Sequence, residues 1–208
     1  MKMKIVLATH NRDKCAEIEE IMNDMPIQLL TLNEFPGIEE IIEDGKTLEE
    51  NALIKAKTVH KITHLPAIAD DTGLEVDALG GQPGIYSARY AGENCSYLDN
   101  VNKLLQEMTN IPPKKRTAIF RTAIVYVDDN MELATEGVVE GVITDLPKGI
   151  DGFGYDPVFY VPDMKKTYAE MSMNKKNQIS HRGKALQNMQ ALLQSCLPEI
   201  FHQMEDIA

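Results

Sequence analysis

The segment that decides the fold is residues 69–92, ADDTGLEVDALGGQPGIYSARYAG, which follows a short apolar run at residues 65–69. An apolar run of this length is typical of a buried strand, and adjacent side chains on a strand point to opposite faces. We therefore expect one carboxylate of the pair Asp70 and Asp71 to face a cleft while the other turns back into the fold. An aspartate at the end of a strand, followed by a Thr-Gly turn, commonly presents a ligand to a hard cation. The glycines and prolines downstream predict a shaped loop, so the whole segment favours metal-assisted chemistry over an ordinary turn.

The composition bounds the class of protein. A chain of 208 residues can bury a full core, and we expect residues 1–208 to form a single two-lobed domain. No apolar run approaches the roughly 18 residues that a membrane helix needs. Cys15, Cys95 and Cys196 are far apart and lack metal-binding spacing, which predicts reduced thiols in a cytoplasmic protein. The net charge of −11 argues against a nucleic-acid surface, so a phosphorylated ligand would need a local group of cations or a bridging metal.

Hydrophobic periodicity and capping residues predict alternating helices and strands. We expect strands at residues 4–9, 27–32, 65–69 and 156–161, helices at 14–24 and 47–64 and after Ser96 and Ser180, and a long hairpin from 116–127 and 132–144. Early alternation of the two element types, followed by a long hairpin, favours an α/β protein with a mixed sheet.

A candidate phosphate site lies where the first expected strand meets the first expected helix. Thr9, His10 and Asn11 occupy this connection, so their backbone N–H groups and the positive end of the helix dipole can face an anion. Lys14 lies one turn into the helix and can place its ammonium over the same spot. The alternative is that Asn11 only caps the helix and Lys14 is solvated.

A second candidate group belongs to the next expected helix and to the acidic loop before it. Asn51 and Lys55 lie four positions apart and therefore share one helix face. The loop offers Glu43 as a candidate metal ligand, with Glu39 and Glu40 as alternatives.

A third candidate group could bind a flat ligand. Phe153 stands between two glycines, which let the backbone approach such a ligand, and stacking on a base is worth about 1–3 kcal/mol. One of Phe153 and Tyr155 could instead belong to the core. Polar residues also gather near the start of the last long helix: Lys176, Ser180, His181 and Arg182.

These groups occur within five motifs spread over nearly the whole chain. The motifs are ATHNRDKCAE at residues 8–17, TLEENALIKA at 47–56, the segment at 69–92, GFGYDPVF at 152–159 and SHRG at 180–183. Their order and content resemble the inosine triphosphate pyrophosphatase family, which removes deaminated purine triphosphates from the nucleotide pool. The resemblance implies a mixed, elongated central sheet flanked by helices, two lobes with the active site in the cleft between them, and a homodimer.

The resemblance also implies roles for individual residues. Asp71 matches the general base and a Mg²⁺ ligand, Asp70 could share the catalytic work, and Glu43 is the candidate second ligand. His10 replaces a common glycine, and Thr72 replaces a common serine. The positions matching substrate-binding residues are Thr9, His10, Asn11, Arg12, Asp13, Lys14, Lys55, Thr72, Phe153, Gly154, Tyr155, Asp156, Lys176, His181 and Arg182.

The expected reaction is Mg²⁺-dependent hydrolysis of ITP, dITP or XTP to the nucleoside monophosphate and pyrophosphate. The alternatives are a Maf-type nucleotide pyrophosphatase, a non-catalytic nucleotide sensor and an RNA-binding module. The first is disfavoured because its opening Ser-x-x-Arg-Arg loop is absent, and the second because both aspartates are intact. The third is disfavoured by the acidic charge, so we expect neither a nucleic-acid nor a membrane partner.

Overall fold

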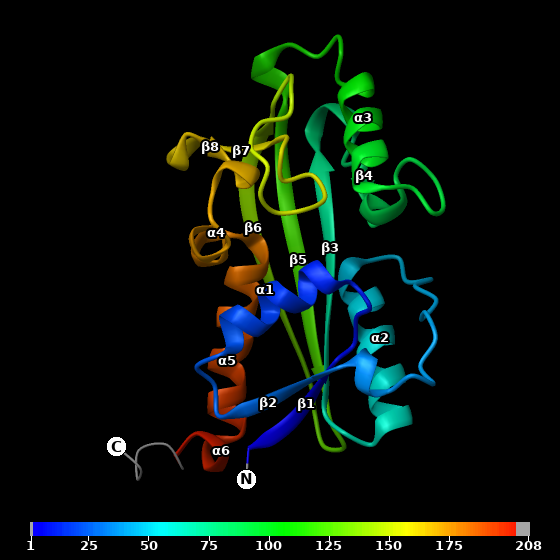
Figure 1. Cartoon of the computed structure of the whole chain (residues 1–208), viewed down its shortest axis with the longest axis vertical. Coiled ribbons are helices and arrows are strands. Elements are labelled where there is room, and N and C mark those ends of the chain that lie inside the picture. Colours follow the sequence, from blue (N-terminus) through cyan, green and yellow to red (C-terminus); the bar gives the residue numbers. More distant parts are fainter. Residues whose placement is uncertain (1, 203–208) are drawn as a thin grey trace. The chain divides into compact units, whose positions relative to one another are not determined.

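The computed structural model describes residues 2–202, which form two compact units. The first unit contains the residues up to Asp71, residues 122–137, and those from Arg182 onward; the second contains residues 72–121 and 138–181. The helices are α1 (Arg12–Met22), α2 (Leu48–Thr63), α3 (Tyr97–Glu107), α4 (Met173–Ile179), α5 (His181–Cys196) and α6 (Pro198–His202) (Figure 1). The strands are β1 (Met3–Leu7), β2 (Ile27–Thr31), β3 (Ala67–Val76), β4 (Pro83–Gly84), β5 (Thr117–Val127), β6 (Glu132–Ile143), β7 (Phe159–Val161) and β8 (Lys166–Thr167).

The strands pair in the order β2-β1-β3-β5-β6-β7-β8, with β4 on β3. β1 is parallel to both β2 and β3, whereas β4, β7 and β8 pair in antiparallel fashion. The expected mixed α/β class, with a central sheet flanked by helices, is therefore confirmed. Each helix among residues 2–202 is too short or too polar to cross a membrane.

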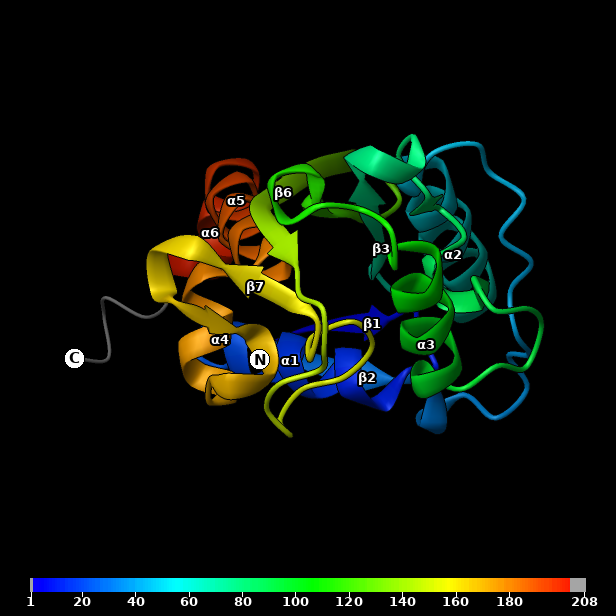
Figure 2. The same cartoon turned by 90° about the horizontal axis from the view of Figure 1, so that it is seen from above.

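The first unit is built on strands that are apolar on both faces. On β1, Ile5 and Leu7 pack with α1 and α5, whereas Val6 packs with α2. The same alternation on β3 puts Ile68 with α1 and α5, and Ala67 and Ala69 with α2. Both views show α5 on one side of these strands and α2 on the other (Figures 1 and 2). Because side chains alternate with a period of two, this register also fixes which helix each following residue of β3 faces.

The second unit has its own core, in which α3 lies on one side of the strands and α4 on the other. Leu104 of α3 and Met108 at its end are fully buried there, together with Phe159 and Tyr168. Arg116 fastens the end of α3, because its Nη2 donates to the Met108 carbonyl oxygen at 2.7 Å. This satisfies a carbonyl that the helix itself leaves without an amide partner.

The helix starts expected at Thr47 and Ser96 are confirmed, whereas the first helix begins at Arg12 and not at Lys14. Thr47 caps α2 by accepting from the Glu50 backbone N–H, and Ser96 caps α3 within a full capping box. The hairpin is also found, as the neighbouring strands β5 and β6.

The expected strand boundaries differ most from the structure at β3 and β7. β3 does not end at Ala69 but continues to Val76, because Leu74 and Val76 are buried in the second core and Leu74 pairs with Gly84. The two aspartates therefore lie within a strand, not after it. In the other direction, β7 begins only at Phe159, because residues 154–158 form turns in which the Val158 and Phe159 N–H groups both donate to the Tyr155 carbonyl oxygen.

Candidate active site

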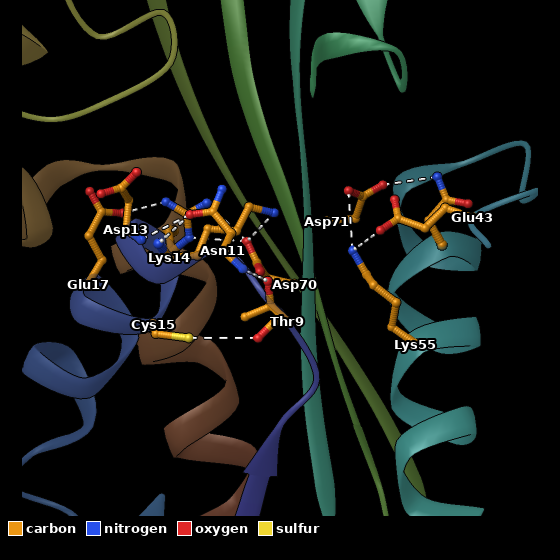
Figure 3. A network of polar contacts seen from close by, with 12 residues as sticks. Thr9, Asn11, Asp13, Lys14, Cys15, Glu17, Glu43, Lys55, Asp70 and Asp71 are labelled. Carbon is orange, nitrogen blue, oxygen red and sulfur yellow. Dashed lines mark hydrogen bonds and ion pairs between the residues drawn. The ribbon is translucent and has the colours of Figure 1, made fainter. Parts of the chain in front are cut away.

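Asp70 and Asp71 point to opposite faces of β3, as the strand period predicts (Figure 3). Asp70 continues the row of Ile68 and contacts Lys14 of α1 at 3.2 Å. Asp71 continues the row of Ala69 and lies 3.6 Å from the ammonium of Lys55 on α2. The two adjacent aspartates thus each contact a lysine from a different helix.

The Asp70 side is a buried ion cluster within the first unit. The Oδ2 atom of Asp70 accepts from Nε and Nη2 of Arg182, at 3.2 and 3.0 Å, and also faces Lys14. Burial by itself would raise the pKa of Asp70, but Lys14 and Arg182 outweigh it and hold this pKa well below its usual range. Asp70 is therefore a permanently ionised group and a poor proton acceptor.

Arg182, one of the positions that match substrate-binding residues, belongs to this ion cluster. Besides the contacts to Asp70, its Nη1 donates to Glu17 of α1, and its side chain is buried. Two buried carboxylates compensate this charge, as a buried guanidinium requires. Arg182 is therefore tied to α1 and β3 of its own unit.

The first loop forms the expected helix start. The Oδ1 atom of Asn11 accepts from the backbone N–H groups of Asp13 and Lys14, so Asn11 is the N-cap of α1. The side chain of Lys14 is largely buried and points to Asp70, which excludes the alternative of a freely solvated lysine. Thr9, His10 and Arg12 line a cavity of about 190 Å³ beside this loop, together with Cys15, Ala16, Glu19, Thr31, Leu32 and Asn33.

The Asp71 side is held from α2. The Nδ2 atom of Asn51 donates to Oδ2 of Asp71 at 3.1 Å, while the ammonium of Lys55 faces Oδ1. The same ammonium lies 2.9 Å from Glu43 of the acidic loop. Burial raises the pKa of Asp71 above its ordinary value, because it outweighs the opposing effect of Lys55 and Lys14. Of the adjacent aspartates, Asp71 is therefore the better proton acceptor.

This side also fits a Mg²⁺ ion. The carboxylates of Glu43 and Asp71 both approach one cationic group, the Lys55 ammonium, so two hard oxygen donors already converge on positive charge. Glu39 and Glu40 are exposed. Within residues 2–202, groups of three or more potential metal ligands are absent. Two carboxylates suit Mg²⁺, which usually keeps several waters and substrate phosphate oxygens as its other ligands.

The second unit holds the candidate base-binding residues. The Oδ2 atom of Asp156 accepts from the Phe153 backbone N–H at 2.9 Å and from the Lys176 ammonium. That ammonium lies 4.7 Å from the centroid of the half-buried Phe153 ring. Gly152 is required here, because a Cβ at this position would lie 2.1 Å from Oδ2 of Asp156. The glycine-rich turn therefore presents one aromatic face next to a fixed cation.

The other predicted residues of this unit differ in how deeply they are buried. Tyr155 is buried and donates to the Ser87 carbonyl oxygen at 2.9 Å, so it is the core aromatic of the pair considered from sequence. His181 is buried and stacks on Phe120, with ring centroids 4.4 Å apart. Gly154 takes a left-handed conformation with φ +62°, and Thr72 is half-buried on β3.

Comparisons with known proteins show the family of the chain. The sequence profile of the Ham1 family matches residues 5–192. The chain belongs to the Ham1 family. It is 47% identical to a dITP/XTP pyrophosphatase of Caldanaerobacter subterraneus subsp. tengcongensis, over 95% of this chain and 99% of that protein. It is 50% identical to a dITP/XTP pyrophosphatase of Geobacter sulfurreducens, over 88% of this chain and 92% of that protein. A solved HAM1 protein structure from Coxiella burnetii has a TM-score of 0.84 and 41% identity, covering 93% of this chain and 99% of that one.

The sequence of this Ham1-family chain did not reveal that Glu17 holds Arg182 in place. Glu17 was visible as part of the first motif and lies three positions after Lys14, on the same helix face. Asn51 was expected to share a helix face with Lys55, and the fold adds its partners, the Gly45 N–H and Asp71.

Proposed function

We propose that this protein hydrolyses ITP, dITP and XTP to the nucleoside monophosphate and pyrophosphate, and so removes deaminated purines from the nucleotide pool. Support comes from its membership of the Ham1 family and from the dITP/XTP pyrophosphatase names of relatives that align over nearly their whole length. We further propose that both units act as one catalytic domain, in a cytoplasmic homodimer.

The observation that carries the proposal is the placement of Asp70 and Asp71 on opposite faces of β3, each beside a lysine from a different helix. A triphosphate needs positive charge from more than one direction, because the leaving pyrophosphate gains negative charge. Lys14 and Lys55 supply that charge, and the N-terminal amides of α1 add the positive end of a helix dipole. The expected loop residues Thr9, His10, Asn11, Arg12 and Asp13 surround those amides.

Water is the nucleophile in this proposal, and Asp71 accepts its proton. Asp71 has the raised pKa and Asp70 the lowered one, so the work divides between neighbours. The oxygen of water bonds to the α-phosphorus, and the bond from that phosphorus to the bridging oxygen breaks. The leaving oxygen departs with pyrophosphate, while Asp70 keeps Lys14 and Arg182 in place.

Glu43 and Asp71 would hold the Mg²⁺ ion, with Asp71 contributing the oxygen that does not accept the proton. The bound ion would supply positive charge to the phosphate oxygens. Glu43 is preferred over Glu39 and Glu40 because it shares the Lys55 ammonium with Asp71.

The base is assigned to the second unit. Phe153 offers a ring on which a purine can stack, and Lys176 holds its ammonium over that ring, where it can donate to the carbonyl oxygen at purine position six. Thr72, Gly154, Asp156 and His181 complete the proposed lining, whereas Arg182 is assigned to the phosphate side with Asp70.

The test is an incubation of the purified protein with ITP and Mg²⁺, followed by separate measurement of pyrophosphate and orthophosphate. We expect pyrophosphate and IMP in equal amounts, and none when a chelator removes the metal. Orthophosphate with IDP would mean that a different phosphorus is attacked, and activity in excess chelator would remove the metal from the proposal.

A further inference from the structure

Two helices of this protein begin with the same pattern, one in each unit. α2 starts with Thr47-Leu-Glu-Glu50-Asn51, and α3 starts with Ser96-Tyr-Leu-Asp99-Asn100. In both, a hydroxyl residue caps the helix, an acidic residue follows at the third helical position, and a buried asparagine occupies the fourth. The two asparagines therefore hold equivalent positions, and differences between their contacts report what each does beyond starting a helix.

Both asparagines tie the preceding loop to the helix. The Oδ1 atom of Asn51 accepts from the Gly45 backbone N–H at 2.9 Å, and Oδ1 of Asn100 accepts from the Ala91 backbone N–H at 2.7 Å. The loop approaches Asn51 so closely that a Cβ on Gly45 would lie 2.6 Å from Oδ1. This contact fixes the end of the acidic loop that carries Glu43.

The donor halves of the two carboxamides have different partners. The Nδ2 atom of Asn100 donates to the Ala88 carbonyl oxygen at 3.0 Å, which is a further tie to the same loop. The Nδ2 atom of Asn51 instead donates to Oδ2 of Asp71 at 3.1 Å, in a buried contact between side chains 20 residues apart. The orientation of the Asn51 amide follows from its partners, because a backbone N–H needs an acceptor and a carboxylate needs a donor.

We propose that Asn51 is a positioning residue that joins the acidic loop to the reacting carboxylate. By donating to Oδ2 of Asp71 it fixes the orientation of the whole carboxylate, whose Oδ1 faces Lys55. The same carboxamide accepts from the Gly45 backbone N–H. One side chain therefore fixes both the orientation of Asp71 and the end of the acidic loop. This role rests on the proposed pyrophosphatase function and adds to it a residue that need not touch the substrate.

The variant Asn51→Asp tests the hydrogen bond from Nδ2 of Asn51 to Asp71 alone. An aspartate has nearly the same shape and can still accept from Gly45, but it turns an oxygen toward Oδ2 of Asp71 and repels it. We expect kcat for ITP to fall about tenfold to a hundredfold, as is typical for groups that orient a metal-binding carboxylate. Hydrogen exchange at the Gly45 amide, which does not depend on activity, should remain slow in this variant.

Asn100→Asp is the matched control. Asn100 exposes 2% of its surface and Asn51 1%, and Asn100 occupies the equivalent position at the start of its helix. It should lose stability toward urea to a similar degree and keep the kcat of the unaltered protein. A fall in kcat of the same size in both variants would overturn the proposal, because Asn51 would then act only as a helix-start residue.

A second pair of measurements tests the route through Asp71. If Asn51 acts on that carboxylate, Asn51→Ala should lower kcat in the unaltered protein but hardly at all when Asp71→Asn is already present. Equal fold-changes in both backgrounds would overturn the proposal. An unaltered protein that releases no pyrophosphate would instead refute the proposed function, so the two failures are distinguishable.

Discussion

Asp70 and Asp71 are adjacent in sequence, yet their carboxylates contact cations from different helices, Lys14 on α1 and Lys55 on α2. The pKa of Asp70 is lowered by Lys14 and Arg182 despite complete burial, whereas burial raises the pKa of Asp71. The strand period that separates the two side chains therefore also separates a carboxylate with a lowered pKa from one with a raised pKa.

We predict that Asp71→Asn lowers kcat for ITP by at least about 10²-fold, because it removes the proton acceptor and a metal ligand while keeping the side-chain shape. Thermal unfolding should show that the fold survives. Asp70→Asn should also lower kcat, but it should lower stability as well, since Arg182 and Lys14 lose their shared partner. Near-normal turnover in folded Asp71→Asn would contradict its assignment as the base.

We predict that Glu43, and not Glu39 or Glu40, is the second Mg²⁺ ligand beside Asp71. Glu43→Gln should raise the Mg²⁺ concentration for half-maximal rate by about tenfold or more. Glu39→Gln and Glu40→Gln, which change exposed residues of the same loop, serve as matched controls and should leave this concentration unchanged. A rise in either control that equals the rise in Glu43→Gln would indicate a general charge effect.

Gly152→Ala should disrupt the base-binding turn. The residue has φ +72°, and the added Cβ would lie 2.1 Å from Oδ2 of Asp156, so that carboxylate must move and release the Phe153 amide. We expect a higher KM for ITP and a smaller change in kcat. Gly154→Ala is the control for backbone strain, because its φ is +62° but its Cβ would meet open space. Equal KM values for the two variants would show that strain alone matters.

How much of this arrangement could be predicted from sequence depends on how local its cause is. The opposite orientation of Asp70 and Asp71 follows from the strand period, and the start of α2 follows from Thr47 and its partner three residues later. The Arg182–Glu17 contact joins residues 165 positions apart and depends on how α5 packs against α1. The strand boundaries failed for a similar reason, because Leu74 and Val76 become buried only once the second core has formed.

The proposed homodimer is predicted to form through one of two candidate surfaces. The Gly84-Ile85-Tyr86 segment and the β5–β6 hairpin are the candidate contact surfaces, and Tyr86 exposes 56% of its surface. We expect light scattering at micromolar concentration to give twice the chain mass. Tyr86→Asp should shift that mass toward the single chain if this segment lies at the contact, because a symmetric interface would bury the new charge twice. A single-chain mass for the unaltered protein would refute the dimer.

The last prediction concerns how deaminated bases are distinguished from adenine. Inosine and xanthosine carry a carbonyl oxygen at purine position six, where adenosine carries an amino group. Lys176 can only donate, so it can bond the carbonyl but would face the amino group donor to donor. A buried donor left without a partner costs about 1–3 kcal/mol, and more when charged, so discrimination of roughly 10²-fold is reachable. Lys176→Met should therefore shrink the ratio of kcat/KM for ITP to that for ATP.

Arg182→Met provides the contrast, because it removes a second buried cation whose contacts are Asp70 and Glu17. It should lower kcat/KM for ITP and ATP in parallel and reduce the free energy of unfolding by about 3–5 kcal/mol, since it removes the guanidinium that two buried carboxylates share. Lys176→Met combined with Asp156→Asn checks whether the first variant acts through a similar loss of stability, since the double change removes both charges of the Lys176–Asp156 ion pair. The opposite result would be a smaller ratio of kcat/KM for ITP to that for ATP in Arg182→Met and an unchanged ratio in both Lys176 variants. Base reading would then belong to Arg182, and its guanidinium would have to leave Asp70 when substrate binds.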